Sequence, residues 1–62
     1  MDFEVTYHGS LILLAALTTE ADNWCEQHLP ADRLIMAGSV VVEPRYIDNI
    51  VTGITSDGLT VA

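Results

Sequence analysis

The sequence predicts a small α+β domain, in which a mainly antiparallel sheet in ββαββαβ order carries two helices on one face. Two hairpin patterns, each with a Gly-Ser step before an apolar strand, alternate with two segments of helical periodicity. A chain of 62 residues hides only about 60% of its unfolded surface and has room for one core. We therefore expect residues 1–62 to form a single domain.

The first hairpin is predicted between residues 2 and 17. Apolar and polar side chains alternate through Phe3, Val5 and Tyr7, which is typical of a half-buried strand. Gly9-Ser10 supplies a turn. The unbroken apolar run from Leu11 to Leu17 favours a strand buried on both faces, although its leucines and alanines also favour a helix.

The first helix is expected to begin after Thr18 and Thr19, because a threonine hydroxyl accepts a hydrogen bond from a free amide at a helix start. Pro30 ends this helix, since it disfavours helical backbone in the residue before it. Helical spacing places one set of side chains on the inward face, namely Ala21, Trp24, Cys25 and His28.

A second hairpin and a second helix follow. Residues 33–36 and 40–43 are predicted strands around an Ala37-Gly38-Ser39 turn, the second of them central in the sheet. Pro44 suits the first turn of the next helix, which Asp57-Gly58 caps before a last short strand at residues 59–61. The expected core contains Leu13, Trp24, Ile47, Ile50 and Val51.

Composition limits the classes of function. Lys+Arg 2 against Asp+Glu 9 gives a formal net charge of -7, which excludes binding to nucleic acid by phosphate neutralisation. Hydrophobic residues make up 50%, too many for a disordered tail, and no apolar run approaches the roughly 18 residues of a membrane span. The lone Cys25 and the acidic start after Met1 predict a cytoplasmic protein without an export signal.

Chemistry-bearing residues are sparse. Cys25 and His28 could meet on one helix face, but neighbouring carboxylates disfavour a thiolate there, so a core thiol is the preferred interpretation. His8 and His28, even with Glu26 or Asp32, form no recognised metal-ligand pattern. We therefore expect no catalytic residue, no metal, no cofactor and no enzymatic activity.

The charged exterior supplies the candidate partner-binding residues. Glu20, Asp22 and Glu26 lie on the outer face of the first predicted helix, and Asp48 and Asp57 add carboxylates from the second. Arg45 and Tyr46 lie in the first turn of the second helix, where they could form a rim contact. These seven residues are the predicted contact set.

The segments from Val41 to Ile47 and from Asp57 to Val61, with His8-Gly9-Ser10 upstream, resemble short uncharacterised proteins of bacterial phages and other mobile elements. In size and acidity the chain also resembles the anti-CRISPR proteins. That resemblance implies no catalytic residues, and some members of the class mimic nucleic acid.

Two functions follow from these observations. The first is an inhibitor whose acidic face blocks a basic nucleic-acid-binding surface of a host protein complex. The alternative is a structural or assembly module that forms a homodimer through its sheet face or edge. Neither requires direct binding to nucleic acid or to a membrane.

Overall fold

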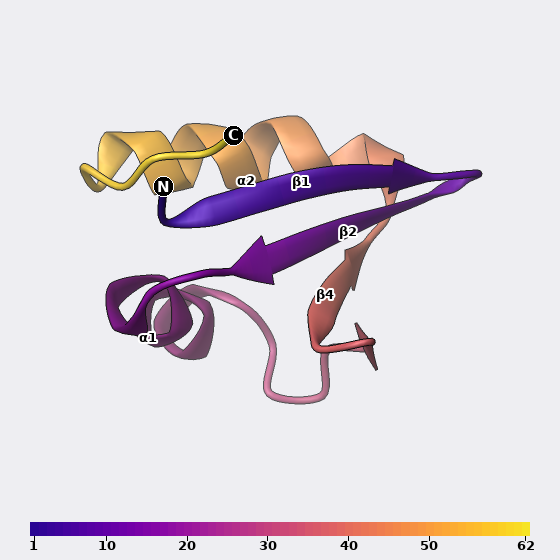
Figure 1. The fold of residues 1–62 in the computed structure, drawn as a ribbon, viewed down its shortest axis with the longest axis horizontal. Coiled ribbons are helices and arrows are strands. Elements are labelled where there is room, and N and C mark those ends of the chain that lie inside the picture. The colour runs from indigo at the N-terminus through magenta and orange to yellow at the C-terminus, as the bar shows by residue number, and fades with distance from the viewer.

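The computed structural model describes residues 1–62 and shows a four-stranded sheet with two helices (Figure 1). The elements, in chain order, are β1 (Phe3–His8), β2 (Leu11–Ala16), α1 (Thr19–His28), β3 (Ile35–Met36), β4 (Ser39–Val42) and α2 (Pro44–Ser56). The strands lie in the order β1-β2-β4-β3, and every neighbouring pair is antiparallel. The predicted α+β class is confirmed, as is the interior place of β4.

Two tight turns close the hairpins. Gly9 has a φ of 65° between β1 and β2, and Ala37 and Gly38 have φ values of 52° and 82° between β3 and β4. Positive φ at both Ala37 and Gly38 is the geometry of a type I′ turn, and positive φ at the first central residue alone, as at Gly9, is that of a type II′ turn; the twist of both types matches that of the flanking strands. Ala37 is the one residue other than glycine with this backbone, so it holds an unfavourable conformation.

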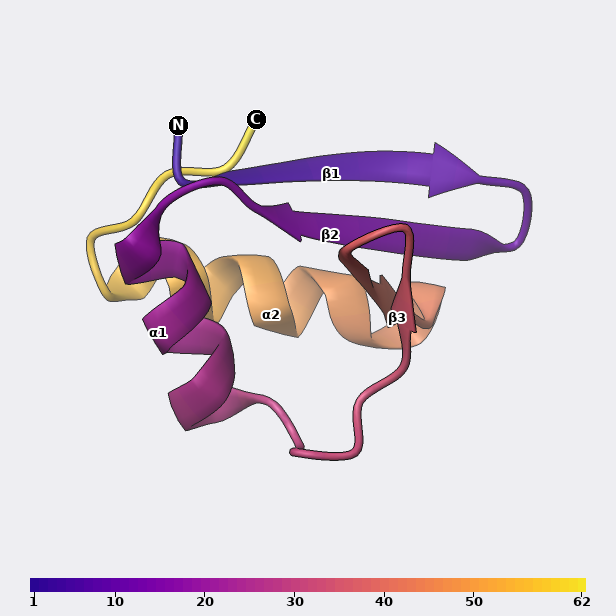
Figure 2. The same cartoon turned by 60° about the horizontal axis from the view of Figure 1, so that its bottom comes forward.

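The helix ends follow the sequence signals. The Thr18 hydroxyl accepts a hydrogen bond from the Ala21 amide at 3.1 Å, and α1 ends before Leu29 and Pro30. Pro44 begins α2, and Gly58, with a φ of 85°, follows its C-cap residue, Asp57. Both helices lie beneath the β1–β2 hairpin, which leaves the other face of the sheet open (Figure 2).

The core lies between this sheet face and the helices. Phe3, Ile12, Leu14 and Ile54 are fully buried, and the Trp24 ring meets Phe3 edge to face at a centroid distance of 5.9 Å. The prediction is confirmed for Trp24 and Ile47. Ile50 and Val51 are partly buried against the same cluster.

The expectation for β2 was wrong in one respect. Ile12 and Leu14 are buried, but Leu11, Leu13 and Ala15 are only half-buried, because successive side chains of a strand point to opposite faces and the second face has no cover. Leu13 is therefore not a core residue. The strand also ends at Ala16, one residue before the end of the apolar run, and Leu17 is exposed.

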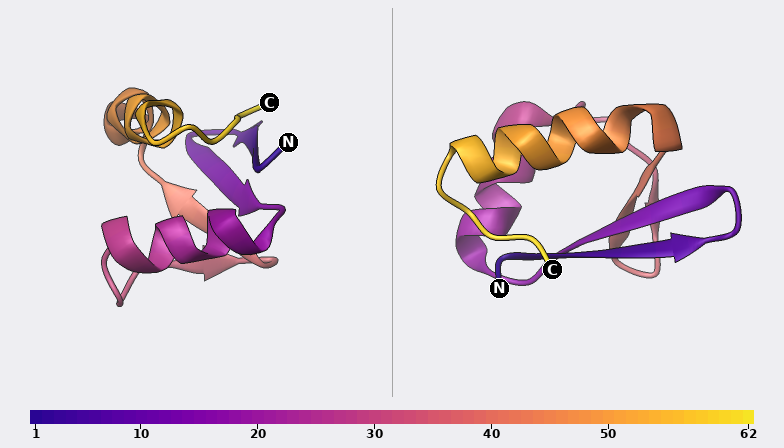
Figure 3. Two further views of the ribbon diagram at one scale, coloured as in Figure 1. Left: turned by 90° about the vertical axis from the view of Figure 1, so that its left-hand side faces the viewer. Right: turned by 90° about the horizontal axis from the view of Figure 1, so that it is seen from above.

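Two smaller expectations were also wrong. The last predicted strand is reduced to one parallel bridge between Phe3 and Val61, and the third strand is only two residues long. His28 lies on the same face of α1 as Trp24, as predicted, and its ring stacks on Trp24, but it is exposed at the end of the helix. The bridge nevertheless brings the C-terminal segment beside the start of β1 (Figure 3).

Asp2 joins the two ends of the chain to α1. Its carboxylate accepts hydrogen bonds from the Thr60 amide at 3.0 Å, the Thr60 hydroxyl at 3.1 Å and the Thr18 hydroxyl at 2.9 Å. The Thr60 backbone bond, followed by the Thr18 bond, lowers the pKa of Asp2 below its ordinary value of 3.8. Three segments distant in sequence are thus held by one ionised side chain.

Neither helix has the length and apolar character needed to cross a membrane.

Candidate functional site

The predicted acidic contact residues of α1 differ in their surroundings. Glu20 and Asp22 are exposed in its first turn, and their carboxylates form no hydrogen bond or ion pair with the rest of the chain. Glu26 accepts a 2.6 Å bond from Arg33, so part of its charge is neutralised within the molecule. The free negative charge of α1 therefore lies mainly at its N-terminal end.

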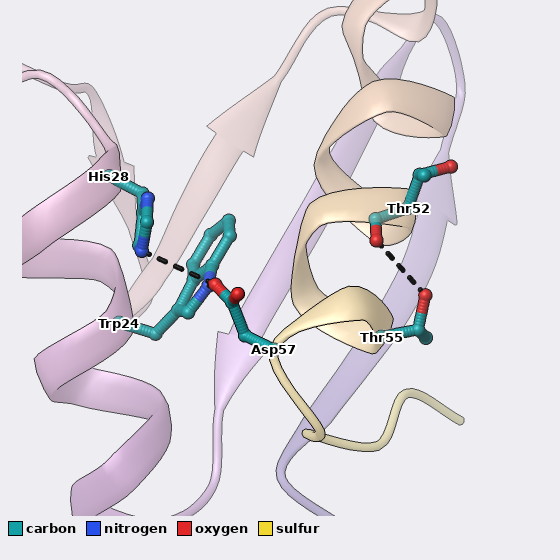
Figure 4. A network of polar contacts seen from close by, with 5 residues as sticks. All are labelled: Trp24, His28, Thr52, Thr55 and Asp57. Carbon is teal, nitrogen blue, oxygen red and sulfur yellow. Dashed lines mark hydrogen bonds and ion pairs between the residues drawn. The ribbon is translucent and has the colours of Figure 1, made fainter.

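Asp57 has an intramolecular role that the sequence did not indicate. One of its carboxylate oxygens accepts a 2.7 Å hydrogen bond from the Trp24 indole and lies 3.4 Å from Nε2 of His28 (Figure 4). The His28 ring stacks on Trp24 at a centroid distance of 4.6 Å. Asp57 thus ties the end of α2 to α1, which leaves its carboxylate less available to a partner.

The start of α2 carries the remaining predicted contact residues. Arg45 forms a 3.1 Å ion pair with Glu43, and its guanidinium carbon lies 4.9 Å from the centre of the Tyr46 ring. Tyr46 is 49% exposed. Asp48 is exposed and unpaired. With Arg33 bound to Glu26, both arginines of the chain are engaged by carboxylates.

An open groove of about 500 Å³ lies between the α1–β3 connection, β4 and the first half of α2. We call it the apolar groove. Its lining is mainly hydrophobic and includes Leu29, Leu34, Val40, Val42, Tyr46 and Ile50. A volume of this size falls within the range of natural binding pockets. Of the seven predicted contact residues, only Tyr46 lines it.

Arg33 holds the outer wall of the apolar groove. Its side chain donates to the Pro30 carbonyl at 3.0 Å and to Glu26, which ties the α1–β3 connection to the end of α1. The Arg33 Nε is buried and has no hydrogen-bond partner. The position of this wall therefore depends on the hydrogen bonds of Arg33, and one donor of Arg33, Nε, has no partner.

Sequence analysis missed the exposed apolar side chains beside this groove. Leu34 is 66% exposed, Ile35 50% and Met36 43%. These three apolar residues are consecutive and belong to a segment too short to be buried on both faces. That combination is the sequence signal that could have identified them as exposed. Neighbouring exposed apolar side chains are typical of interaction surfaces.

Cys25 belongs to the core. It is buried, and burial raises the pKa of its thiol. A raised pKa favours the neutral thiol over the nucleophilic thiolate. His28 is directed to Asp57, and no cluster of three or more His, Cys, Asp or Glu residues in the structure could hold a metal ion.

The open face of the sheet is a second apolar surface. Leu11, Leu13 and Ala15 of β2 lie beside Val41 of β4 on this face, all of them half-buried without a covering element. Glu4, opposite Ala15 on β1, is exposed. This surface lies on the side of the sheet away from the helices, and Val41 lines the apolar groove as well.

Searches of protein-family models, of curated proteins and of solved structures found no match to this chain. The resemblance to mobile-element proteins therefore stays a prediction.

Proposed function

We propose that this protein acts by binding another protein, as a small acidic inhibitor of the anti-CRISPR type that covers a basic nucleic-acid-binding surface. The observation that carries the proposal is the apolar groove, with exposed Leu34 and Tyr46 at its rim, on a body whose two arginines are both paired with carboxylates. The unpaired carboxylates are Glu4, Glu20, Asp22, Asp32 and Asp48.

The two features have separate roles in this proposal. Unpaired negative charge steers a basic partner and raises the association rate, an effect that salt screens within about 10 Å at 0.1 M. The apolar groove accepts an apolar side chain of that partner and slows dissociation, since desolvated pockets near the centre of an interface supply most of its binding energy. Glu20 and Asp22 occupy positions that phosphates of the displaced nucleic acid would otherwise fill.

A displacement assay tests the proposal. Fluorescent DNA bound to purified bacterial CRISPR effector complexes is titrated with this protein, and we expect the DNA to be released. Glu20→Gln combined with Asp22→Asn should weaken release, as should Leu34→Ser in the apolar groove.

Glu4→Lys is the matched control for the charge variant, because it changes the net charge by the same amount on the open sheet face. Equal weakening by Glu4→Lys and by the α1 double variant would show that net charge alone matters. Unchanged release by all three variants would contradict the proposed surface.

The open sheet face supports a second candidate, self-association as an assembly module. Leu11, Leu13 and Val41 would be covered if two copies packed face to face. The charge of -7 on each copy opposes such pairing at low salt. Sedimentation equilibrium at rising salt should then show a dimer that Leu13→Lys abolishes, and a monomer at high salt would exclude this candidate.

A further inference from the structure

The outer edge of β1 is only half covered. The Phe3 amide donates to the Thr60 carbonyl at 2.9 Å, the Ala62 amide donates to the Phe3 carbonyl at 2.9 Å, and the Val5 amide donates to the Ala62 carbonyl at 3.3 Å. The three bonds make residues 60–62 a short parallel neighbour of β1. The chain thereby shows that this edge accepts an extended, parallel segment.

The same edge continues unpaired to the end of β1. Backbone groups of an antiparallel strand face its neighbour at alternate residues, and in β1 the outward set consists of Phe3, Val5 and Tyr7. Past the Ala62 contact, the Val5 carbonyl and both backbone groups of Tyr7 therefore face away from the sheet. The Tyr7 side chain is 71% exposed.

A second groove, of about 480 Å³, runs beneath this free edge. Its walls are Val5 and Tyr7 of β1, Ile47 and Val51 of α2, and the last two residues of the chain. We call it the edge groove. It shares no lining residue with the apolar groove. Because Val5 and Tyr7 lie on the same sheet face as buried Phe3, the edge groove extends the hydrophobic core outward.

We propose that the free edge of β1 binds an extended segment of a partner protein, which runs parallel to β1 and alternates apolar with basic side chains. The register explains the apolar positions. Val61 lies opposite Phe3, so the next inward-pointing positions along the same line fall opposite Val5 and then Tyr7, within the edge groove. Main-chain hydrogen bonds hold such an added strand, and the groove selects its side chains.

Charge selects the basic residues of the occupant. The side chains between these apolar positions point to the open face of the sheet, where Glu4 of β1 is exposed and unpaired, and the whole chain has a net charge of -7. A second copy of this chain fits less well, since it adds as many negative charges again. The β1 edge of a second copy is also covered at Phe3 by its own C-terminal residues. The site is separate from the apolar groove and does not depend on the proposed function.

The test uses three synthetic heptapeptides and the isotope-labelled protein. One peptide alternates valine with lysine, one has the same composition with its valines and lysines in separate blocks, and one alternates valine with glutamate. We expect the alternating lysine peptide to shift the amide resonances from Val5 to His8 and to slow exchange of the Tyr7 amide by about tenfold or more. The block peptide and the glutamate peptide should bind at least several-fold more weakly.

Two charge variants separate binding at the β1 edge from general attraction. Glu4→Lys should weaken binding of the alternating lysine peptide by about fivefold or more, whereas Glu20→Lys, with the same change in net charge, should have a smaller effect. Leu34→Ser, in the apolar groove, should leave peptide binding unchanged, so failure of one site is distinguishable from failure of the other.

Several results would overturn the inference. Equal binding of the alternating and block peptides would mean that only charge attracts them. Resonance shifts confined to α1 or the apolar groove would show that the peptide does not bind at the β1 edge. The absence of binding at millimolar peptide would show that the β1 edge is not a binding site. Shifts of the same β1 amides on concentrating the protein alone would make a second copy the occupant.

Discussion

Replacing Gly53 by alanine should stabilise the protein, although the change is made where the two helices meet. Gly53 lies within α2 with helical backbone, and alanine is favoured over glycine in a helix interior by about 0.8–1.0 kcal/mol. The added Cβ would lie 3.4 Å from Cζ2 and 3.9 Å from Cη2 of Trp24, which is van der Waals contact without overlap. We therefore expect a gain of about 0.5–1 kcal/mol.

Urea denaturation followed by Trp24 fluorescence and by circular dichroism measures this gain. For a domain of this size, each kcal/mol also raises the melting temperature by about 4–8 °C. Thr52→Ala is the control, because Thr52 is exposed on the same helix and alanine there changes propensity without approaching Trp24.

A loss of stability in Gly53→Ala, with a gain in Thr52→Ala, would refute this reasoning. It would mean that Trp24, held by Asp57 and stacked on His28, does not accommodate the added methyl group at this distance. Gly53→Val extends the series, since its two further methyl groups should overpack the same contact at a cost of about 1–3 kcal/mol.

Two further predictions concern Asp2 and Ala37. The pKa of Asp2 is lowered in the folded protein, so its contribution to the free energy of unfolding is present above pH 3.8 and is lost as the pH falls through the lowered pKa. Asp2→Asn should therefore reduce the dependence of stability on pH between about pH 5 and about pH 2, measured as urea midpoints. An unchanged acid slope would contradict this role. Ala37→Asn should raise the unfolding free energy by about 0.5–1 kcal/mol, since asparagine tolerates the left-handed backbone that the turn requires, whereas Ala37→Val should lower it in the same denaturation assay.

Local signals explain how much of the fold could be predicted. The turn residues Gly9 and Gly38, the cap at Thr18 and the helix end at Pro30 each act within a few residues, so the sequence located both hairpins and both helices. The apolar run after Ser10 was different. Every residue in it is apolar, so the sequence has no polar and apolar alternation that distinguishes the buried face from the open one. Leu13 was therefore wrongly predicted to be a core residue.

Long-range pairing explains what the sequence could not predict about the candidate sites. Asp57 matched a helix cap, but its hydrogen bond to Trp24 joins residues 33 positions apart. The apolar groove is likewise assembled from three segments that are separate in the sequence. Among its lining residues, only Tyr46 was predicted as a contact residue. Leu34 matched a strand pattern, and its exposure follows from the absence of a covering element, which no local pattern records.

The parallel bridge at the chain ends has a mechanical consequence. Residues 60–62 run in the same direction as β1, so a force that pulls the two termini apart draws the two segments past one another along their length. The hydrogen bonds of Phe3 and Val5 then carry the load together instead of opening one after another. Under tension from its ends, this small domain should therefore yield by shear at its periphery before the β1–β2 hairpin is loaded.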